Sequence, residues 1–147
     1  LVFDKQSDVF TSEGWSFNGN WENHLNWDKK NQAKYSSTKG DEISFTFEGT
    51  GVSITGNWFK NGGKADVYVD NVLQRTIDCF FYYATQELEN MNIYHILGLR
   101  EGKHTVKIVV KGEKRPDSQG ENIYVSGATV YKTSKKANEE YKFSFQQ

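Results

Sequence analysis

The sequence predicts an all-β protein, an antiparallel β-sandwich of jelly-roll type, and three observations lead to this fold class. Apolar and polar residues alternate through many short stretches, as in strands that turn one face to a core and the other to water. Glycine and asparagine turns separate these stretches at short intervals. No stretch keeps helical periodicity for three turns. About eight or nine short strands of this kind fit two packed sheets.

Three of the expected strands lie between Phe45 and Asn71, where the alternation is clearest. Between the second and third of them, the polar segment 57–61 carries an aromatic residue, Trp58, with no obvious place in a core. Glycines mark the two turns, where backbones often need positive φ. These glycines are Gly49, Gly51, Gly62 and Gly63. The apolar positions of the three strands are Phe45, Phe47, Val52, Ile54, Ala65, Val67 and Val69.

The remaining elements follow from the same pattern. Residues 1–17 indicate one entering strand, and 18–31 a long polar loop without periodicity. The segment 81–92 is irregular, with a helical turn expected around 86–90. The apolar residues occupy odd positions up to Val125 and even positions from Ala128 onward. This change of alternation predicts a bulge near Gly127. Further strands are expected at 33–38, 72–80, 93–99, 104–111 and 123–130.

Length and composition limit the class of protein. The chain has 147 residues, enough for one domain with a core, which we assign to 1–132; residues 133–147 form either a closing strand or the start of a linker. A net charge of −1 gives no basis for a nucleic-acid partner. No apolar run is long enough to cross a membrane. Cys79 is alone in an apolar run and is expected to be a buried, inert thiol. Because the chain begins at Leu1 without a signal sequence, it is expected to be part of a longer protein.

Strand alternation also predicts where the long connections lie. Successive antiparallel strands reverse direction, so every second connection falls at the same end of the sandwich. The connections 57–63, 80–92 and 112–121 should therefore meet at one end, and the short turns at the other. Loops held by a rigid scaffold favour ligand sites, so the predicted site lies where the long connections meet.

Several pieces of the chain occur in the order found in a known family. They are FTFEGTGVSITG from Phe45, GGKADVYVDN from Gly62, IDCF from Ile77, GLREGKHTVKIVVKGEK from Gly98, a Ser-x-Gly at Ser118 and a closing Gly-Ala-Thr-Val at Gly127. Over about residues 9–132, this succession resembles the galactose-binding-domain-like β-sandwich of carbohydrate-binding modules. The family's usual Asp-Gly turn is Asp70-Asn71 here, and Asn also tolerates positive φ.

The resemblance implies a secreted, periplasmic or cell-surface module that binds a polysaccharide or glycan. Such modules are joined covalently to the catalytic domain of a glycoside hydrolase, polysaccharide lyase or carbohydrate esterase. No cofactor is expected. Some of these modules hold a structural calcium ion, but no set of calcium ligands matches here. The same sandwich serves many ligands, so a structural spacer or a protein-docking domain stays open as the alternative.

Binding residues follow from the chemistry of sugars, which have an apolar face of C–H groups and a rim of hydroxyls. Trp58 is the first candidate for a stacking platform, with Asn57 and Lys60 as rim partners; the alternative is a Trp58 folded over the end of the sandwich. Tyr82 and Tyr83 could wall the same groove, although some of the aromatic residues at 80–83 must enter the core.

Two charged residues and a polar loop complete the candidates. Arg115 and Asp117 could bind hydroxyls, or Arg115 an acidic sugar, or both could belong to a solvated turn with a local salt bridge. Trp21, His24 and Trp27 fall at the opposite end by strand counting, where they indicate packing or a second site. Because a loop this long could wrap an edge of the sandwich, Trp21 also stays a candidate carbohydrate-binding residue of the main site.

The catalytic alternatives lack their sequence signals. The three His residues show no metal-ligand spacing, and there is no Gly-x-Ser-x-Gly nucleophile motif or phosphate-binding glycine loop. Ser118 has no evident base. A glycosidase needs two carboxyl groups at a set separation, which the sequence cannot reveal. The sequence therefore favours a noncatalytic accessory domain.

Overall fold

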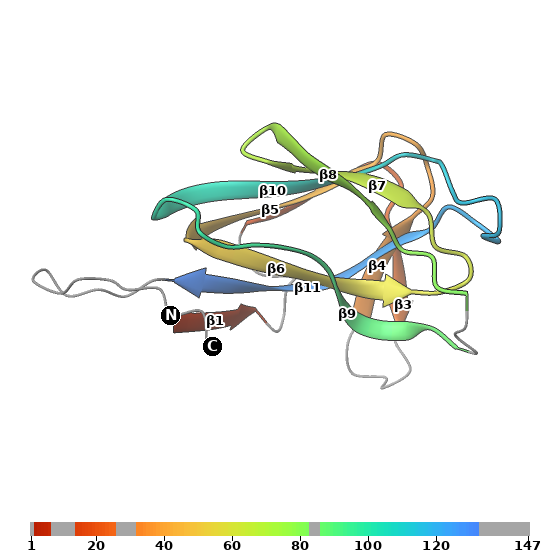
Figure 1. The fold of residues 1–147 in the computed structure, drawn as a ribbon, viewed down its shortest axis with the longest axis horizontal. Coiled ribbons are helices and arrows are strands. Elements are labelled where there is room, and N and C mark those ends of the chain that lie inside the picture. Colours follow the sequence, from red (N-terminus) through yellow and green to blue (C-terminus); the bar gives the residue numbers. More distant parts are fainter. Residues whose placement is uncertain (1, 7–13, 26–31, 83–85, 133–147) are drawn as a thin grey trace, which may run out of the picture.

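The fold is an antiparallel β-sandwich, as predicted (Figure 1). The computed structural model describes residues 2–6, 14–25, 32–82 and 86–132. One sheet has the strand order β3-β4-β11-β6-β9, with β1 also paired to β11; the other has the order β2-β5-β10-β7-β8. The strands are β1 (Val2–Gln6), β2 (Trp15–Asn18), β3 (Glu22–Leu25), β4 (Gln32–Ser36), β5 (Glu42–Gly49), β6 (Gly51–Trp58), β7 (Lys64–Val69), β8 (Val72–Asp78), β9 (Leu88–Ile96), β10 (Gly102–Val110) and β11 (Ile123–Lys132).

The core forms between the sheets from the alternating apolar residues. In β5 and β7 every second residue is buried, which is the pattern that the sequence predicts for strands with one face in water. Trp15, Phe17, Trp21 and Trp58 are partly buried and pack against this core. The fully buried apolar side chains come from both sheets and include Ile43, Val52, Ile54, Val67, Val106, Ile108, Val110, Ile123 and Val125.

Two local predictions are confirmed. Asp70 and Asn71 join β7 to β8 with φ of 51° and 67°, so both turn residues adopt the left-handed conformation. The pairing of β11 with β6 shifts register between Val125 and Gly127, which is the expected bulge. Cys79 is completely buried, as expected, and its burial, followed by the nearby Asp78 charge, raises the pKa of the thiol to about 12.

Other local predictions are wrong. The segment 1–17 does not form a single strand: β1 pairs with β11 in one sheet, whereas β2 pairs with β5 in the other. The segment 18–31 contains the strand β3. No helical turn forms at 86–90, because β9 already begins at Leu88 and pairs with Trp58 of β6. Strand pairing with a distant partner overrides the weak local preference in these segments.

Positive φ is not the reason for glycine at Gly62 and Gly63, since neither has a positive φ. A Cβ atom on Gly62 would collide with the carbonyl of Cys79, and one on Gly63 would lie 2.5 Å from Glu121. Both glycines therefore allow close approach of backbones from neighbouring segments. The described part of the chain contains no helix that could span a membrane. The last segment, 133–147, and with it the closing strand or linker, lies outside the described residues.

Candidate functional site

The three long connections meet at one end of the sandwich, as strand counting predicts, and we call this the loop end (Figure 1, right). The backbone N–H of Gln119 donates to the carbonyl of Lys60 at 2.7 Å, which joins the connection 112–121 to 57–63. Phe81 N–H donates to the carbonyl of Phe59 at 3.0 Å, which joins 80–92 to the same segment. The connections thus form one hydrogen-bonded unit.

Ser118 is the side chain that fastens this unit. It is 5% exposed, and its Oγ lies 2.7 Å from the carbonyl oxygen of Gly62, 2.9 Å from that of Gly120 and 3.0 Å from that of Lys60. The single hydroxyl proton serves three carbonyl acceptors in turn. Ser118 is therefore a structural latch, which accounts for the missing base in the sequence.

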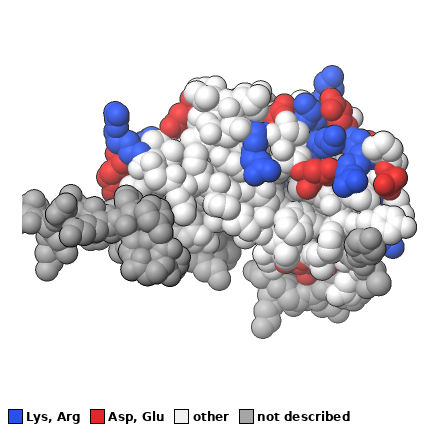
Figure 2. Space-filling model, in the orientation of Figure 1, with Lys and Arg blue, Asp and Glu red and all other residues white. Residues whose placement is uncertain are grey.

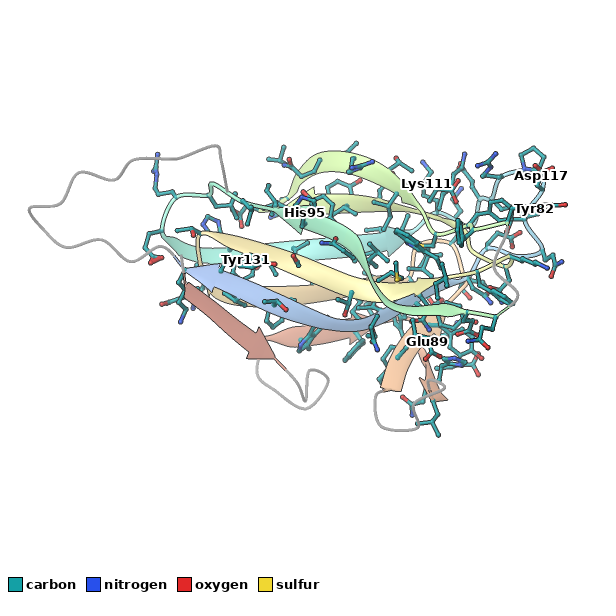
Figure 3. All side chains as sticks on the ribbon, turned by 60° about the horizontal axis from the view of Figure 1, so that its bottom comes forward. Tyr82, Glu89, His95, Lys111, Asp117 and Tyr131 are labelled. Atoms are coloured by element: carbon teal, nitrogen blue, oxygen red, sulfur yellow. The ribbon has the colours of Figure 1, made fainter. Side chains whose placement is uncertain are left out.

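The loop end contains a cleft with a volume of about 590 Å³. Its lining combines aromatic and charged residues of two connections, namely Phe80, Phe81, Tyr82, Arg115 and Asp117. The Tyr82 side chain is 60% exposed and meets the Phe80 ring edge-on at 6.3 Å between centroids. The volume lies in the range of small-ligand sites. Figure 3 shows Tyr82 and Asp117 near each other at this end.

The charges of the cleft remain available to a ligand. The Arg115 guanidinium lies 5.2 Å from the centre of the Phe80 ring, so the ring orients the cation without neutralising it. Within the described residues, Arg115 and Asp117 form no ion pair with each other, so the salt bridge of the alternative interpretation is absent there. Both side chains are exposed. Figure 2 shows charges of both signs gathered over this end of the molecule.

The structure places Trp58, Asn57 and Lys60 differently from the expected platform and rim. Trp58 ends β6 with its ring partly buried against the core, 6.3 Å from the Phe81 ring and tilted by 56°. Asn57 is 1% exposed, and its amide donates to Glu87 Oε2 at 3.1 Å. Lys60 is half-buried and contributes its carbonyl to the joined connections. These three residues are not among the described residues that line the cleft, while Tyr83 lies outside the described residues.

For residues 18–21, the predicted position at the opposite end is wrong. The backbone N–H of Asn20 donates to Asp41 Oδ2 at 2.8 Å, and the Asp41 carbonyl accepts from Val110 N at the end of β10, which leads into the connection 112–121. The unpredicted strand β3 adds one reversal of direction, which moves residues 18–21 to the loop end. Trp21 packs there, with its indole N–H 2.8 Å from the carbonyl of Glu42.

Sequence reasoning missed two features of this end. Phe80 and Phe81 both line the cleft, although their neighbourhood suggested that one or more would be core; only their pairing with Phe59, in space, reveals their position. His24 of β3 lies with Glu87 and Glu89 in a group that could hold a metal ion. No spacing in the sequence signals this group, because its members come from different strands. Trp27 lies outside the described residues.

Known proteins share parts of this sequence and its fold. No family model matches the chain. Over 94 residues, 63% of the chain, it is 35% identical to the A type blood N-acetyl-alpha-D-galactosamine deacetylase of Flavonifractor plautii. Over 92 residues, 62% of the chain, it is 34% identical to the A type blood alpha-D-galactosamine galactosaminidase of the same organism. The chain covers 12% and 8% of these two enzymes.

Solved structures with the same fold come from enzymes and from a separate module. A two-domain esterase (CEX) active on acetylated mannans has a TM-score of 0.65 at 14% identity over 91% of this chain and 38% of its own. The CBM36-1 domain of a multidomain xylanase from the hindgut metagenome of Trinervitermes trinervoides has a TM-score of 0.55 at 15% identity over 90% of this chain and 98% of its own. A Paenibacillus xanthan lyase has a TM-score of 0.57 at 10% identity, over 80% of this chain and 12% of its own.

The chain shares its β-sandwich fold with the CBM36-1 domain, the esterase and the lyase. The predicted resemblance is confirmed at the level of the fold, since these solved structures share it at low identity. The sequence relatives are named as carbohydrate-active enzymes, and the chain matches a small segment of each. Its cleft at the loop end is the candidate functional site.

Proposed function

We propose that this domain is a noncatalytic carbohydrate-binding module, with its glycan site in the cleft between Phe80 and Asp117. The observation that carries the proposal is the composition of that cleft. An exposed aromatic ring, Tyr82, stands beside two charged side chains, Arg115 and Asp117, which form no ion pair with any described residue, in a cavity of about 590 Å³. A flat ring with nearby charged hydrogen-bonding groups matches the apolar face and hydroxyl rim of a sugar.

In the proposed mode of binding, each part of the cleft contacts one part of the sugar. The Tyr82 ring stacks on the C–H face, and Phe80 and Phe81 form the apolar floor. Arg115 donates to ring or hydroxyl oxygens through its planar fork, and Asp117 accepts from hydroxyls. The Ser118 latch and the backbone hydrogen bonds to Lys60 hold these side chains in place before the glycan arrives, so little ordering entropy is lost on binding.

The relatives direct the choice of glycan. Both Flavonifractor plautii enzymes carry A type blood galactosamine substrates in their names. The first glycans to test therefore end in N-acetylgalactosamine or galactosamine. The Asp117 carboxylate suits the free amine of galactosamine, which is a cation at neutral pH, through a charge-assisted hydrogen bond.

The context of the domain follows from the same relatives. Their segments belong to much longer carbohydrate-active enzymes, which supports a covalently attached catalytic domain in the full-length protein. In this arrangement the module holds the enzyme at its glycan outside the cytoplasm, and chemistry takes place in the other domain. The Ser118 hydroxyl is engaged in structural hydrogen bonds to backbone carbonyls, which supports the assignment of catalysis to the other domain.

A glycan array followed by calorimetry tests the proposal. The array contains galactosamine-terminated, N-acetylgalactosamine-terminated and galactose-terminated glycans, together with neutral and acidic polysaccharides. The strongest binder is then titrated into wild type, Tyr82→Ala, Arg115→Ala and the matched control Arg100→Ala, whose exposed Arg lies at the opposite end. We expect Tyr82→Ala and Arg115→Ala each to weaken binding about tenfold, about 1.4 kcal/mol, while Arg100→Ala binds as wild type.

Two results would contradict the proposal. Unchanged affinity in both cleft variants would leave the module function but move the site, first toward Trp58 and Trp21. Absence of binding across the array at millimolar glycan would favour the structural spacer or protein-docking domain.

A further inference from the structure

A second group of side chains at the loop end has the chemistry of a metal site. His24 Nε2 and the carboxylates of Glu87 and Glu89 offer ligand atoms that all lie within 4.8 Å of one another. The residues are partly buried, with His24 and Glu87 side chains 27% and 14% exposed. None of them lines the cleft of the proposed carbohydrate site.

Local structure explains how the three side chains meet. Glu87 directly precedes β9 and Glu89 is its second residue, and their carboxylates approach each other and the His24 ring. His24 stands in β3, and its imidazole approaches from the other strand pair. Figure 3 shows Glu89 beside β3 and β4. The site therefore joins two parts of the chain that are remote in sequence.

The contact between His24 and Glu87 differs from an ordinary hydrogen-bonded ion pair. His24 Nε2 lies 2.9 Å from Glu87 Oε2, yet within the described residues this enclosed nitrogen has no hydrogen-bond partner of acceptable direction. Adjacent ligand atoms of a tetrahedral Zn²⁺ site stand about 3.4 Å apart when each bond is about 2.1 Å long. The observed separation of 2.9 Å is within about 0.5 Å of this value, as for two adjacent ligands that face a common point.

Surrounding residues orient His24 and Glu87. Asn57 donates from Nδ2 to Glu87 Oε2 at 3.1 Å, and its Oδ1 accepts from Asn90 N at 3.3 Å. The His24 ring packs edge-on against Tyr124 at 5.1 Å between centroids. Hydrogen bonds and packing behind the ligands are typical of metal sites in proteins. They also explain why a polar residue such as Asn57 is buried.

We propose that His24, Glu87 and Glu89 bind a divalent first-row transition metal ion, with Zn²⁺ as the best match. Imidazole nitrogen with carboxylate oxygen suits Zn²⁺ and its neighbours in the series. The same set does not suit the calcium ion implied by the family resemblance, since Ca²⁺ takes six to eight oxygen ligands. Bound Zn²⁺ would cross-link β3 to the start of β9 and so stabilise the folded domain.

Titration of the untagged domain with Zn²⁺ alone tests the site. We expect calorimetry to show one site, and the midpoint of thermal unfolding to rise by about 4 °C or more at a Zn²⁺ concentration of 100 times Kd. An equal concentration of Ca²⁺ should leave the midpoint unchanged. His24→Ala and the isosteric Glu89→Gln should each weaken Zn²⁺ binding at least about tenfold. His95→Ala is the matched control, because His95 is an exposed imidazole on the same strand, β9.

The spectrum of the imidazoles supplies a direct readout. In NMR spectra, Zn²⁺ should shift the ring nitrogens of His24 and leave those of His95 in place. Equal loss of affinity in His24→Ala and His95→Ala would mean adventitious surface binding and would overturn the proposal. Undiminished Zn²⁺ affinity in folded Glu89→Gln, or stabilisation by Ca²⁺ that survives His24→Ala, would overturn it as well. All these results are independent of glycan binding, so the experiments test the proposed metal site separately from the proposed carbohydrate site.

Discussion

At the scale of single residues, burial separates the candidate ligand-binding side chains from the structural ones. Tyr82 is 60% exposed in the cleft, whereas Asn57 is 1% exposed and does not line it. Both stand in polar, aromatic-rich segments that look alike in the sequence. Their roles differ because neighbours from other strands cover one of them and leave the other open.

Trp58 provides a prediction about this distinction. Its ring packs against the core and against Phe81, so Trp58→Ala should cost about 2 kcal/mol of unfolding free energy, less than the loss from a fully buried ring. Urea unfolding measures this, with Trp58→Phe expected to retain most of the stability. If Trp58→Ala instead keeps full stability and abolishes glycan binding, Trp58 is the stacking platform that the sequence suggests.

His104 provides a prediction about pH. Its Nδ1 lies 2.6 Å from Asp70 Oδ2 and its Nε2 2.6 Å from the carbonyl of Arg100, so both ring nitrogens face acceptors, as the imidazolium requires. The hydrogen bond to the Arg100 carbonyl, then that to Asp70, raises the pKa of His104 above 6.5. Partial burial acts to raise the pKa of Asp70, but the hydrogen bonds from His104 and Thr105 outweigh it, so this pKa falls below 3.8.

The sign of the effect follows from these directions. The stabilisation from His104 is complete below about pH 6.5 and is lost as pH rises through its raised folded-state pKa; that from Asp70 is present above about pH 3.8 and is lost as pH falls. The melting temperature of wild type should therefore exceed that of His104→Gln most near about pH 5.5, and the difference should shrink by about pH 9. Asp70→Asn, which tolerates the positive φ of 51°, should show the same loss. A pH-independent difference would refute the pairing.

At the scale of elements, the strands follow from local pattern but the connections do not. β5, β7 and β10 lie within a few residues of their expected positions, because each keeps strict alternation. β3 lacks such a pattern and exists through its pairing with β4. Because strand counting omitted β3, it assigned residues 18–21 to the wrong end of the sandwich, so one weak element changed the predicted location of Trp21.

The latch at Ser118 leads to a prediction at this scale. Ser118→Ala removes a buried hydroxyl that lies within 3.0 Å of three carbonyl oxygens and should cost about 1–3 kcal/mol of stability. It should also weaken glycan binding, because Arg115 and Asp117 lose their fixed position while both side chains remain present. Chemical unfolding and calorimetry measure the two effects. Ser37→Ala, at an exposed turn position, should change neither.

At the scale of the whole molecule, one core joins both sheets. Ile54 of β6 and Ile108 of β10 are 1% and 2% exposed and belong to the same cluster, although their strands lie in different sheets. Either residue changed to Ala should cost about 2–5 kcal/mol and keep a single unfolding transition. Tryptophan fluorescence and far-UV circular dichroism should give the same midpoint. Leu73→Ala, at a position 54% exposed, is the control and should cost far less. Two separate transitions would mean that the sheets unfold independently.

The sequence by itself determined the class of fold, most strands, the Asp70-Asn71 turn and the bulge near Gly127, because alternation, turn preference and parity act between neighbours along the chain. It also predicted that the connections 57–63, 80–92 and 112–121 share one end. Only the tertiary structure decided that Tyr82 lines the cleft, that Trp58 packs partly buried against the core and that His24 lies with Glu87 and Glu89. The burial and the contacts of a side chain depend on which strands pair. Strand pairing depends on packing across the whole core and not on any local stretch of sequence.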